Sequence, residues 1–291
     1  MMKLLAKPVA EAIQLNIRVR ADIFIQKYKR APTLVVVLVG NDPASVIYTT
    51  KKNETARKLG FDSKTMALPD TATPREVKSV IDQLNEEAGV DGILIQRPLP
   101  KGFQESEVLY WVTPEKDVDA FHPINAGRLF LDIPSFQPCT PAGVMELLDY
   151  YEISPAGKTV CVIGRSSIVG KPMAVLLLKA DATVIHCHSK TPNLRSMTRQ
   201  AEILVVAVGK MGFIDRSYIR PGAVVIDVGM HRDKQGKLGG DVLYDDVFPV
   251  VSAITPVPGG VGPMTIAILL QNTIAAAELR ETGWFHLRSF K

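Results

Sequence analysis

The sequence predicts an α/β fold of two domains, each built on a parallel sheet. At 291 residues the chain is long enough for two domains of ordinary size. Over roughly the first 120 residues, strand-like apolar runs alternate with helical patterns, an order typical of parallel sheets with helices on both faces. Farther along, a strand, a glycine turn and a helix lie between Thr159 and Leu178, which is typical of a dinucleotide-binding unit.

The first domain begins with an amphipathic helix at residues 8–29, which has apolar side chains along one side. Residues 33–40, TLVVVLVG, form a continuous apolar run that suits a strand buried on both faces. Thr73 and Glu76 have the spacing of a capping box at the start of a helix. The predicted order continues with a helix at 43–59, a strand at 62–68, a helix at 73–88 and a strand at 90–96.

A domain boundary is expected in residues 114–140, which are irregular and rich in Pro, Gly and Asp. Beyond it we expect a helix from Pro141 and strands that begin at Thr159, Ala182, Ile203 and Ala223. A long apolar helix at 263–280 is expected to pack back onto the first domain. The predicted domains are therefore 1–140 together with the C-terminal helix at about 263–291, and a Rossmann-like domain at 141–262.

Composition argues against membrane and nucleic-acid proteins. No apolar run approaches the ~20 residues that span a bilayer, and the N-terminus makes a poor signal peptide. The net charge of +4 is scattered, which predicts mild attraction for small anions and no nucleic-acid surface. The three cysteines form no C-x-x-C pair, so we expect free thiols and a cytoplasmic location. His186 and His188 lack a third ligand at suitable spacing, so no metal is expected.

The glycine turn after the strand at Thr159 is the first candidate site. Gly164 ends the strand and Gly170 precedes a helix, an arrangement that presents backbone N–H groups to a phosphate. The usual G-x-G-x-x-G pattern is absent, because Ser166 stands at the second glycine. A strand–helix unit with two glycines and no ligand is the alternative interpretation.

The end of the next strand favours NADP over NAD. A site for NAD would place Asp or Glu there to bind the ribose hydroxyls. This strand, at 182–189, ends instead in His188 and Ser189, and Arg165 lies in the glycine turn. A guanidinium and a hydroxyl are thus available for a 2′-phosphate, and no carboxylate repels it. His188 has a second interpretation, as a residue that caps the strand end.

Tyr48 and Lys52 are the candidates for acid–base chemistry, because they lie four residues apart on one helix face. A partly buried lysine at a sheet edge can transfer protons, although a solvated lysine is the alternative. Gln96 ends a buried strand, where its amide can bind Lys52 or a ligand. Asp119 lies in an acidic loop and is a binding or a turn residue. Residues 255–263, TPVPGGVGP, predict a loop that lines a ligand site.

These residues lie within motifs that resemble the bifunctional methylenetetrahydrofolate dehydrogenase/cyclohydrolase enzymes over essentially the whole chain. The matching segments are VGNDPAS-IY---K (39–52), DGILIQ-PLP (91–100), KDVD-FHPIN-GRL (116–129), PCTP-G (138–143), VIGRS-IVGKPMA (162–174), ATV--CHSKT (182–191), ILVVAVGK-GFI (203–214), PGAVVIDVG (221–229) and TPVPGGVGPMTIA (255–267).

The resemblance implies an N-terminal folate-binding catalytic domain, an NADP-binding domain, a folate site in the cleft between them, and a homodimer. It implies that Lys52 is the acid/base of hydrolysis, with Gln96 adjusting Lys52, Tyr48 stacking on the folate and Asp119 holding the pterin. Two further residues, Pro258 and Gly259, would line the same pocket. The residues implied to contact NADP are Gly164, Arg165, Ser166, Ser189 and Met230.

The implied function is NADP-dependent oxidation of 5,10-methylenetetrahydrofolate to the 5,10-methenyl compound, followed by hydrolysis to 10-formyltetrahydrofolate. The alternatives are a monofunctional dehydrogenase of the same family, a general NADP dehydrogenase for small hydroxy acids, and a non-catalytic folate- or nucleotide-binding protein. Several residues depart from the family pattern without removing a proposed catalytic group. They are Asn53 and Glu54 after Lys52, Arg97, Ala120, Ser167 and Met230.

Overall fold

The computed structural model describes residues 1–233 and 235–283 and divides them into two compact units. Of the described residues, unit 1 contains 1–12 and 138–268, and unit 2 contains 13–137 and 269–283. Each unit is an α/β structure built on a parallel sheet, as predicted.

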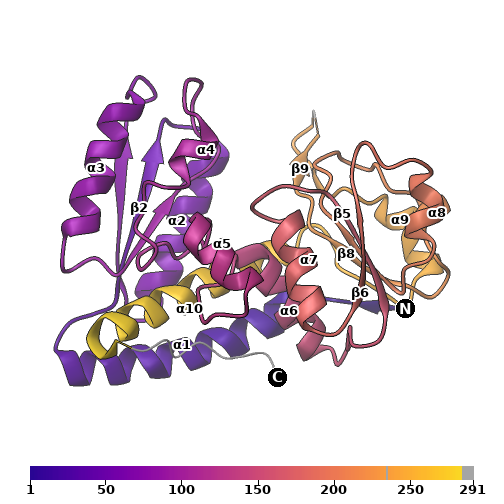
Figure 1. The fold of residues 1–291 in the computed structure, drawn as a ribbon, viewed down its shortest axis with the longest axis horizontal. Helices are drawn as coiled ribbons and strands as arrows, with labels where there is room; N and C mark the ends of the chain where they lie inside the picture. The colour runs from indigo at the N-terminus through magenta and orange to yellow at the C-terminus, as the bar shows by residue number, and fades with distance from the viewer. Residues whose placement is uncertain (234, 284–291) are drawn as a thin grey trace. The chain divides into compact units, whose positions relative to one another are not determined.

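Unit 2 has a three-stranded parallel sheet in the order β3-β2-β4. The central strand β2 (Thr33–Val39) is buried along its whole length, as its apolar sequence predicts for a strand covered on both faces. Helix α2 (Pro43–Lys58) connects β2 to β3 (Asp62–Leu68), and α3 (Pro74–Glu86) connects β3 to β4 (Gly92–Ile95). These two helices cover opposite faces of the sheet (Figure 1).

Capping residues set where these helices begin. The Asp42 carboxylate accepts a hydrogen bond from the Ser45 N–H at 2.8 Å, which starts α2. This interaction, chiefly the backbone hydrogen bond, lowers the pKa of Asp42. Thr73 and Glu76 form the predicted capping box at the start of α3.

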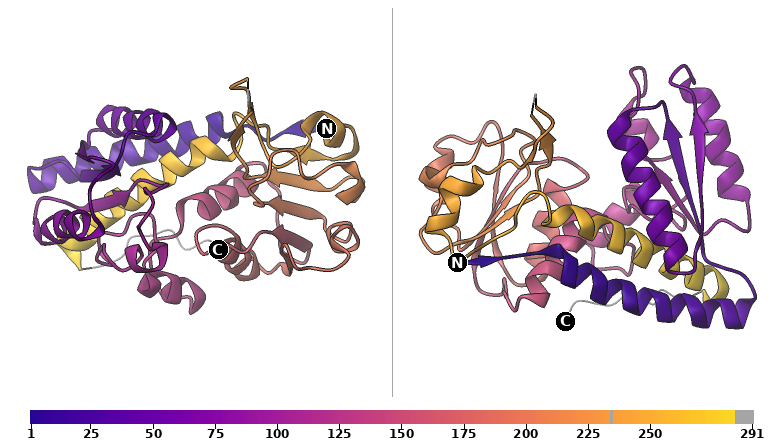
Figure 2. Two further views of the ribbon diagram at one scale, coloured as in Figure 1. Left: turned by 90° about the horizontal axis from the view of Figure 1, so that it is seen from above. Right: turned by 180° about the vertical axis from the view of Figure 1, so that it is seen from behind.

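Two long helices complete unit 2. The part of α1 (Ala6–Tyr28) in this unit runs beside the corresponding part of α10 (Val261–Thr282), as Figure 2 shows. Arg20 of α1 pairs with Glu278 of α10 through two hydrogen bonds. The C-terminal helix therefore packs on the first α/β domain from residue 269, as expected, while its first residues belong to unit 1. Residues 284–291 of the predicted C-terminal segment lie outside the described residues.

Two shorter helices, α4 (Glu105–Val108) and α5 (Pro123–Phe130), were not predicted. Helix α5 lies within the stretch expected to be irregular. Its N-cap is His122, whose Nδ1 accepts a hydrogen bond from the Ile124 N–H at 3.1 Å. Histidine is not among the preferred N-cap residues, so the start of this helix was not recognised, although Pro123 at its first position is a typical helix-start residue.

Unit 1 has a six-stranded parallel sheet in the order β1-β11-β8-β7-β5-β6. The strands are β5 (Thr159–Ile163), β6 (Thr183–Cys187), β7 (Ile203–Val206), β8 (Val224–Asp227), β11 (Ala253–Ile254) and β1 (Met2–Lys3). The last two strands were not predicted, because two-residue segments show no periodicity. Through β1, the start of the chain joins the sheet of unit 1.

Helices cover both faces of this sheet. On one face, a buried apolar cluster that includes Val206 and Val225 packs beneath α8 (Leu194–Thr198), α9 (Tyr244–Val247) and the 3₁₀ helices η1 (Arg216–Tyr218) and η2 (Phe248–Val250). Two longer helices, α6 (Cys139–Tyr150) and α7 (Gly170–Lys179), lie together in Figure 1. A separate two-stranded antiparallel hairpin consists of β9 (His231–Arg232) and β10 (Leu238–Gly239).

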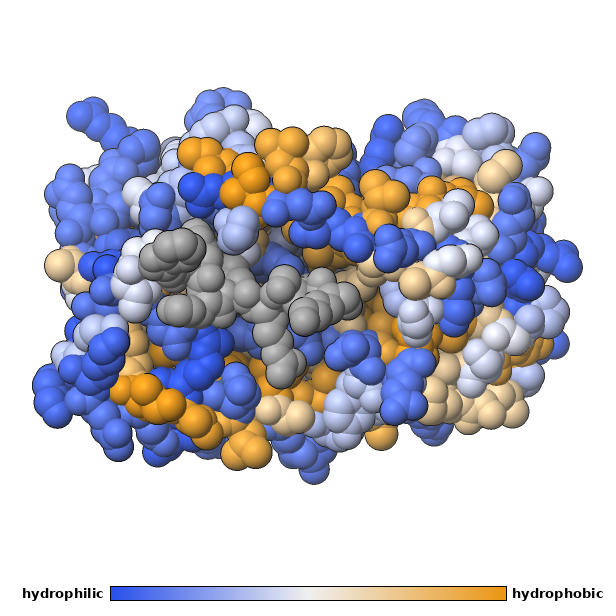
Figure 3. Space-filling view, turned by 60° about the horizontal axis from the view of Figure 1, so that its bottom comes forward, coloured by the Kyte–Doolittle hydropathy of each residue, from blue (hydrophilic) through white to orange (hydrophobic). Residues whose placement is uncertain are grey.

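Figure 3 shows the hydropathy of one face of the molecule. On the face shown in Figure 3, hydrophilic residues predominate and hydrophobic residues gather in several separate patches. Within residues 1–233 and 235–283, every helix is too short or too polar to cross a membrane.

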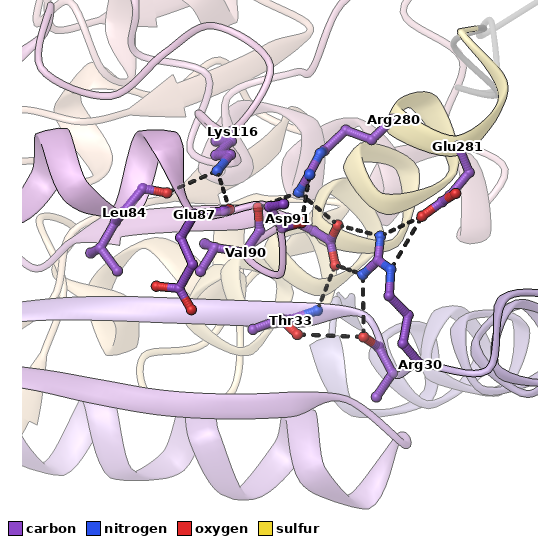
Figure 4. Close-up of polar contacts among 11 residues, drawn as sticks. Arg30, Thr33, Leu84, Glu87, Val90, Asp91, Lys116, Arg280 and Glu281 are labelled. Carbon is purple, nitrogen blue, oxygen red and sulfur yellow. Dashed lines mark hydrogen bonds and ion pairs between the residues drawn. The ribbon is translucent and has the colours of Figure 1, made fainter.

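A buried carboxylate joins the sheet of unit 2 to its C-terminal helix (Figure 4). The Asp91 side chain is fully buried and accepts hydrogen bonds from Arg30 at 2.8 and 2.9 Å and from the Thr33 N–H at 2.8 Å. Arg280 of α10 lies 3.3 Å from the same carboxylate and also donates to the carbonyl oxygens of Ala88 and Val90. This network holds the starts of β2 and β4 against the last turn of α10.

We predict that Asp91→Ala lowers the free energy of unfolding by about 3–5 kcal/mol, because it leaves two arginines and a backbone N–H without their buried acceptor. Urea denaturation measures this change. The matched control is Asp82→Ala, which removes an exposed pair with Lys78 on α3 and should cost about 1 kcal/mol or less. An equal loss in the two variants would contradict the assigned role of Asp91.

Candidate active site

The topology of unit 2 defines one place for a ligand. The chain forms β2 first, then β3 on one side of it and β4 on the other. In open parallel sheets, ligands bind beyond the carboxyl ends of the strands where the strand order reverses. That point lies between β2 and β4, and the predicted residues of unit 2 come from the segments around it.

Lys52 and Gln96 meet at this point. Lys52 is 8% exposed, and its Nζ donates a hydrogen bond to Gln96 Oε1 at 2.9 Å, as the sequence led us to expect. The other end of the amide is also engaged, because Gln96 Nε2 donates to the Arg97 carbonyl oxygen at 2.7 Å. The Gln96 oxygen is thereby turned toward the lysine. Tyr48 lies one helical turn before Lys52 on α2 and is half-buried.

Asp119 belongs to a segment that runs beside β4. Asp117 forms an isolated parallel bridge with Ile93 of β4, and the chain then turns at Val118 and Asp119, where the Ala120 N–H donates to the Asp117 carbonyl oxygen at 3.0 Å. Asp117 and Asp119 therefore differ in role. Asp117 is buried and accepts hydrogen bonds from the His122 N–H at 2.7 Å and from Asn125 at 2.9 Å, while burial raises the pKa of its carboxyl. Asp119 is half-buried in the turn that follows this bridge.

Three of the residues that depart from the family pattern in this unit, Asn53, Arg97 and Ala120, have identifiable structural settings. Asn53 is buried and bonds Thr65 at 2.6 Å and Ser63 at 2.7 Å, so it anchors α2 to β3 directly after Lys52. Arg97 pairs with Glu105 at 3.0 Å. Ala120 has a φ of 59°, in the left-handed region that favours glycine, so this alanine retains a backbone shape suited to glycine.

The strand order of unit 1 reverses between β5 and β7, and the glycine turn lies there. Gly164 has a φ of 126°, and a Cβ at this position would lie 2.2 Å from the carbonyl oxygen of Ala207 in the loop after β7. No larger residue fits. Ser166 replaces the expected second glycine, and its Oγ accepts hydrogen bonds from the N–H groups of Val169 and Gly170 at 3.2 and 3.3 Å.

Exposed polar side chains surround this turn. Arg165 and Ser166 are exposed in the loop after β5, and Ser189 is exposed in the loop after β6. The two loops are joined because the Gly164 N–H donates to the Cys187 carbonyl oxygen at 2.9 Å. His188 organises the strand end, since its Nδ1 accepts from the Lys190 N–H at 3.2 Å. The guanidinium and hydroxyl expected for a 2′-phosphate are therefore at one edge of the sheet.

The remaining predicted residues of unit 1 lie in loops that follow other strands. Met230 is 40% exposed and follows β8, while Pro258 and Gly259 follow β11. The Gly259 carbonyl oxygen accepts a hydrogen bond from the Ala6 N–H at 2.9 Å, which ties this loop to the start of α1.

Sequence reasoning missed two buried carboxylates beside these loops, Asp227 and Asp241. Asp227 ends β8, and its backbone N–H donates to Thr255 Oγ1 at 2.8 Å. Burial raises the pKa of the Asp227 carboxyl to about 6, against the opposing effect of three backbone N–H donors. A possible signal was the position of Asp227 at a strand end and of Asp241 after two glycines. In the part of the chain that the structure describes, no cluster of three potential metal ligands occurs.

The geometry of both units defines a class: a two-domain α/β protein with a dinucleotide-binding unit and a separate lysine–amide site. Residues 4–119 match the family model described as the tetrahydrofolate dehydrogenase/cyclohydrolase catalytic domain. Residues 138–281 match the NAD(P)-binding domain of the same family. The chain therefore belongs to the tetrahydrofolate dehydrogenase/cyclohydrolase family.

Relatives support this assignment along nearly the whole chain. The bifunctional protein FolD of Ligilactobacillus salivarius is 50% identical over 275 residues, which is 94% of this chain and 96% of the relative. The crystal structure of the bifunctional enzyme FolD from Campylobacter jejuni has a TM-score of 0.93 and 42% identity, and covers 96% of this chain and 99% of its own. A Trypanosoma brucei FolD structure, complexed with NADP cofactor and inhibitor, has a TM-score of 0.92 and 35% identity. The match covers 97% of this chain and 99% of the T. brucei chain.

The raised pKa of Asp227 predicts a pH dependence of stability. Between the ordinary pKa of 3.8 and about 6, the folded protein binds more of this proton than the unfolded chain does, so this group makes folding less favourable as pH rises. We predict that the advantage of the wild type over Asp227→Asn in free energy of unfolding shrinks by roughly 2 kcal/mol from pH 4 to pH 6.5. Urea denaturation at several pH values measures it.

The control for this measurement is Asp149→Asn, at an exposed position of α6. The difference in free energy of unfolding between this variant and the wild type should stay constant over the same pH range. A difference between wild type and Asp227→Asn that grows with pH would contradict the assigned environment of Asp227.

Proposed function

We propose that the protein is a bifunctional enzyme of one-carbon metabolism. It oxidises 5,10-methylenetetrahydrofolate to 5,10-methenyltetrahydrofolate with NADP, and it hydrolyses that product to 10-formyltetrahydrofolate. The observation that carries the proposal is the buried hydrogen bond between Lys52 and Gln96 at the ligand end of the unit 2 sheet. Family membership and the likeness to bifunctional FolD proteins support both activities.

We assign the folate chemistry to residues 1–140 with the C-terminal helix, and NADP binding to residues 141–262. The unit 1 loops fit NADP because the glycine turn at Gly164 has no room for a Cβ, and the bare backbone there lets a ligand approach closely. Arg165 and Ser189 provide a charge and a hydroxyl for the 2′-phosphate. The proposed contact residues are Gly164, Arg165, Ser166, Ser189 and Met230.

The oxidation step is mainly a problem of positioning. NADP, when bound, accepts the hydride that leaves the one-carbon bridge of the substrate. The protein's part is to hold the folate ring, and we assign this to Tyr48 by stacking and to Asp119 by hydrogen bonding. For Pro258 and Gly259, substrate contact is proposed from the family resemblance.

The hydrolysis step needs one group that takes up a proton and later releases it. Water adds to the carbon between N5 and N10 of the methenyl cation, and Lys52 removes a proton from that water. The bond from this carbon to N5 then breaks as Lys52 returns the proton to N5. The hydroxyl group of the adduct loses its proton to solvent water, which leaves the formyl group on N10. Gln96 suits both stages, because an uncharged amide oxygen accepts a hydrogen bond from the amine and from the ammonium form of Lys52.

A homodimer and a cytoplasmic location are also proposed, from the family resemblance. The three cysteines are free and buried, as expected for a reducing compartment. Light scattering of the purified protein measures the oligomeric state.

We predict that Lys52→Met lowers the rate of 5,10-methenyltetrahydrofolate hydrolysis at least ~100-fold, because the step loses its acid and base. The Kd for NADP should stay within about twofold of the wild type, since Lys52 lies in unit 2 and the proposed NADP residues lie in unit 1. Loss of methenyl absorbance measures hydrolysis, and fluorescence titration measures NADP binding.

The matched control is Lys51→Met, which removes the neighbouring lysine on the exposed side of the same helix. It should hydrolyse the methenyl compound at nearly the wild-type rate. Loss of NADP affinity with unchanged hydrolysis in Lys52→Met would contradict the role of Lys52. A wild type that oxidises the substrate and does not hydrolyse the methenyl compound would indicate a monofunctional dehydrogenase.

A further inference from the structure

The loops after β7 and β8 are organised around a pair of buried carboxylates that the proposed chemistry leaves unassigned. Asp227 is 3% exposed and Asp241 is fully buried. Both lie in unit 1, at the carboxyl end of the sheet. Both carboxylates accept hydrogen bonds mainly from backbone N–H groups, so they fix the backbone conformation of the loops.

Asp241 holds the turn after β7. Its Oδ2 accepts hydrogen bonds from the N–H groups of Val208 and Gly209 at 2.7 and 3.0 Å, and its Oδ1 accepts one from Lys210 at 2.8 Å. Three consecutive backbone donors thus converge on one carboxylate. Because hydrogen bonds to a buried charged group are among the strong ones, the shape of the turn at 208–210 depends on this side chain.

The same carboxylate also fixes the segment after β8. His231 Nε2 lies 2.7 Å from Asp241 Oδ1, and the Gly229 N–H donates to Asp227 Oδ1 at 2.9 Å. The residue between them is Met230, whose side chain is 40% exposed. Met230 is therefore held from both sides by the carboxylate pair.

Asp227 in turn fixes the place of Asp241. Its two oxygens accept hydrogen bonds from the N–H groups of Asp241 at 3.0 Å and Val242 at 2.9 Å. Space around the pair is closed: a Cβ at Gly229 would lie 2.5 Å from the Asp241 carboxyl carbon, and one at Gly240 would lie 1.9 Å from an Asp227 oxygen. The arrangement has no room to shift.

The position of these loops indicates what they serve. A dinucleotide-binding sheet has two mononucleotide halves at the same edge. The proposed contacts for the adenosine half, Gly164, Arg165 and Ser189, follow β5 and β6. The turn at 208–210 and the segment at 229–231 follow β7 and β8, on the other half of the sheet, where the nicotinamide half of the cofactor belongs.

We propose that Asp241 is a positioning residue for the nicotinamide half of NADP, because its one carboxylate holds the backbone at 208–210 and the His231 side chain of segment 229–231, and both segments border this half. The proposal rests on the proposed function. Asp241 acts through these segments and has no direct contact with the cofactor in this account.

The test compares NADPH with 2′,5′-ADP, which contains only the adenosine half with its 2′-phosphate. In the Asp241→Asn variant of the full chain, an amide NH2 group replaces one carboxylate oxygen and faces two of the present donors in either orientation, those of Val208 and Gly209 or those of Lys210 and His231. We expect the Kd for NADPH to rise at least tenfold, while the Kd for 2′,5′-ADP and the rate of methenyl hydrolysis stay within twofold. Asp246→Asn, which removes a surface partner of Arg216 in the same unit, should change none of the three values.

A folded Asp241→Asn variant with an unchanged Kd for NADPH would overturn the proposal. Equal weakening of NADPH and 2′,5′-ADP would also overturn it, because that pattern indicates a general loss of structure. If Asp241→Asn does not fold, the His231→Phe variant provides the test, because it removes one of the four hydrogen-bond donors to Asp241. We expect its Kd for NADPH to rise two- to fivefold and its Kd for 2′,5′-ADP to stay unchanged. A wild type that fails to bind NADPH would contradict the proposed function itself.

Discussion

Both candidate sites depend on one constraint, the order in which each parallel sheet is assembled. In unit 2, β2 is an inner strand, and the strands that follow it in the chain, β3 and β4, pair with it on opposite sides. In unit 1, β6 and β7 pair with the two sides of β5 in the same way. The loops at the carboxyl ends of these strands then diverge, which leaves a place for a ligand. Lys52 and Gln96 come from one such point, and the turn at Gly164 forms the other.

Buried carboxylates then fix the backbone, Asp91 at the starts of β2 and β4, and Asp227 and Asp241 at the ligand end of the unit 1 sheet. Asp91 accepts from a backbone N–H and two arginines in unit 2, and Asp227 and Asp241 accept mainly from backbone N–H groups in unit 1. A buried carboxylate needs such donors because it has lost its water. Since the donors belong to segments far apart in sequence, each carboxylate makes several loops depend on one another. Loops held in this way can keep a cofactor and a substrate in a defined geometry.

Much of this architecture could be predicted from the sequence. Continuous apolar runs such as 33–39 identified the central strands, and the Thr73–Glu76 spacing identified the start of α3. The Lys52–Gln96 contact was also expected, because both residues follow parallel strands at one sheet edge. Strands β1 and β11 were missed because two residues show no pattern, and helix α5 was missed because its N-cap is a histidine. The roles of Asp91 and Asp241 depend on contacts between distant segments, which no local pattern reveals.

The central claim is that one chain performs an NADP-dependent oxidation and the hydrolysis that follows it. The most direct measurement mixes the wild-type protein with 5,10-methylenetetrahydrofolate and NADP, then with NAD, and records NADPH or NADH together with methenyl absorbance. The account predicts that NADPH forms while little methenyl compound accumulates, and that NAD supports a slower reaction. Methenyl compound that accumulates in step with NADPH would contradict the hydrolytic half, and no reduction of either cofactor would contradict the account as a whole.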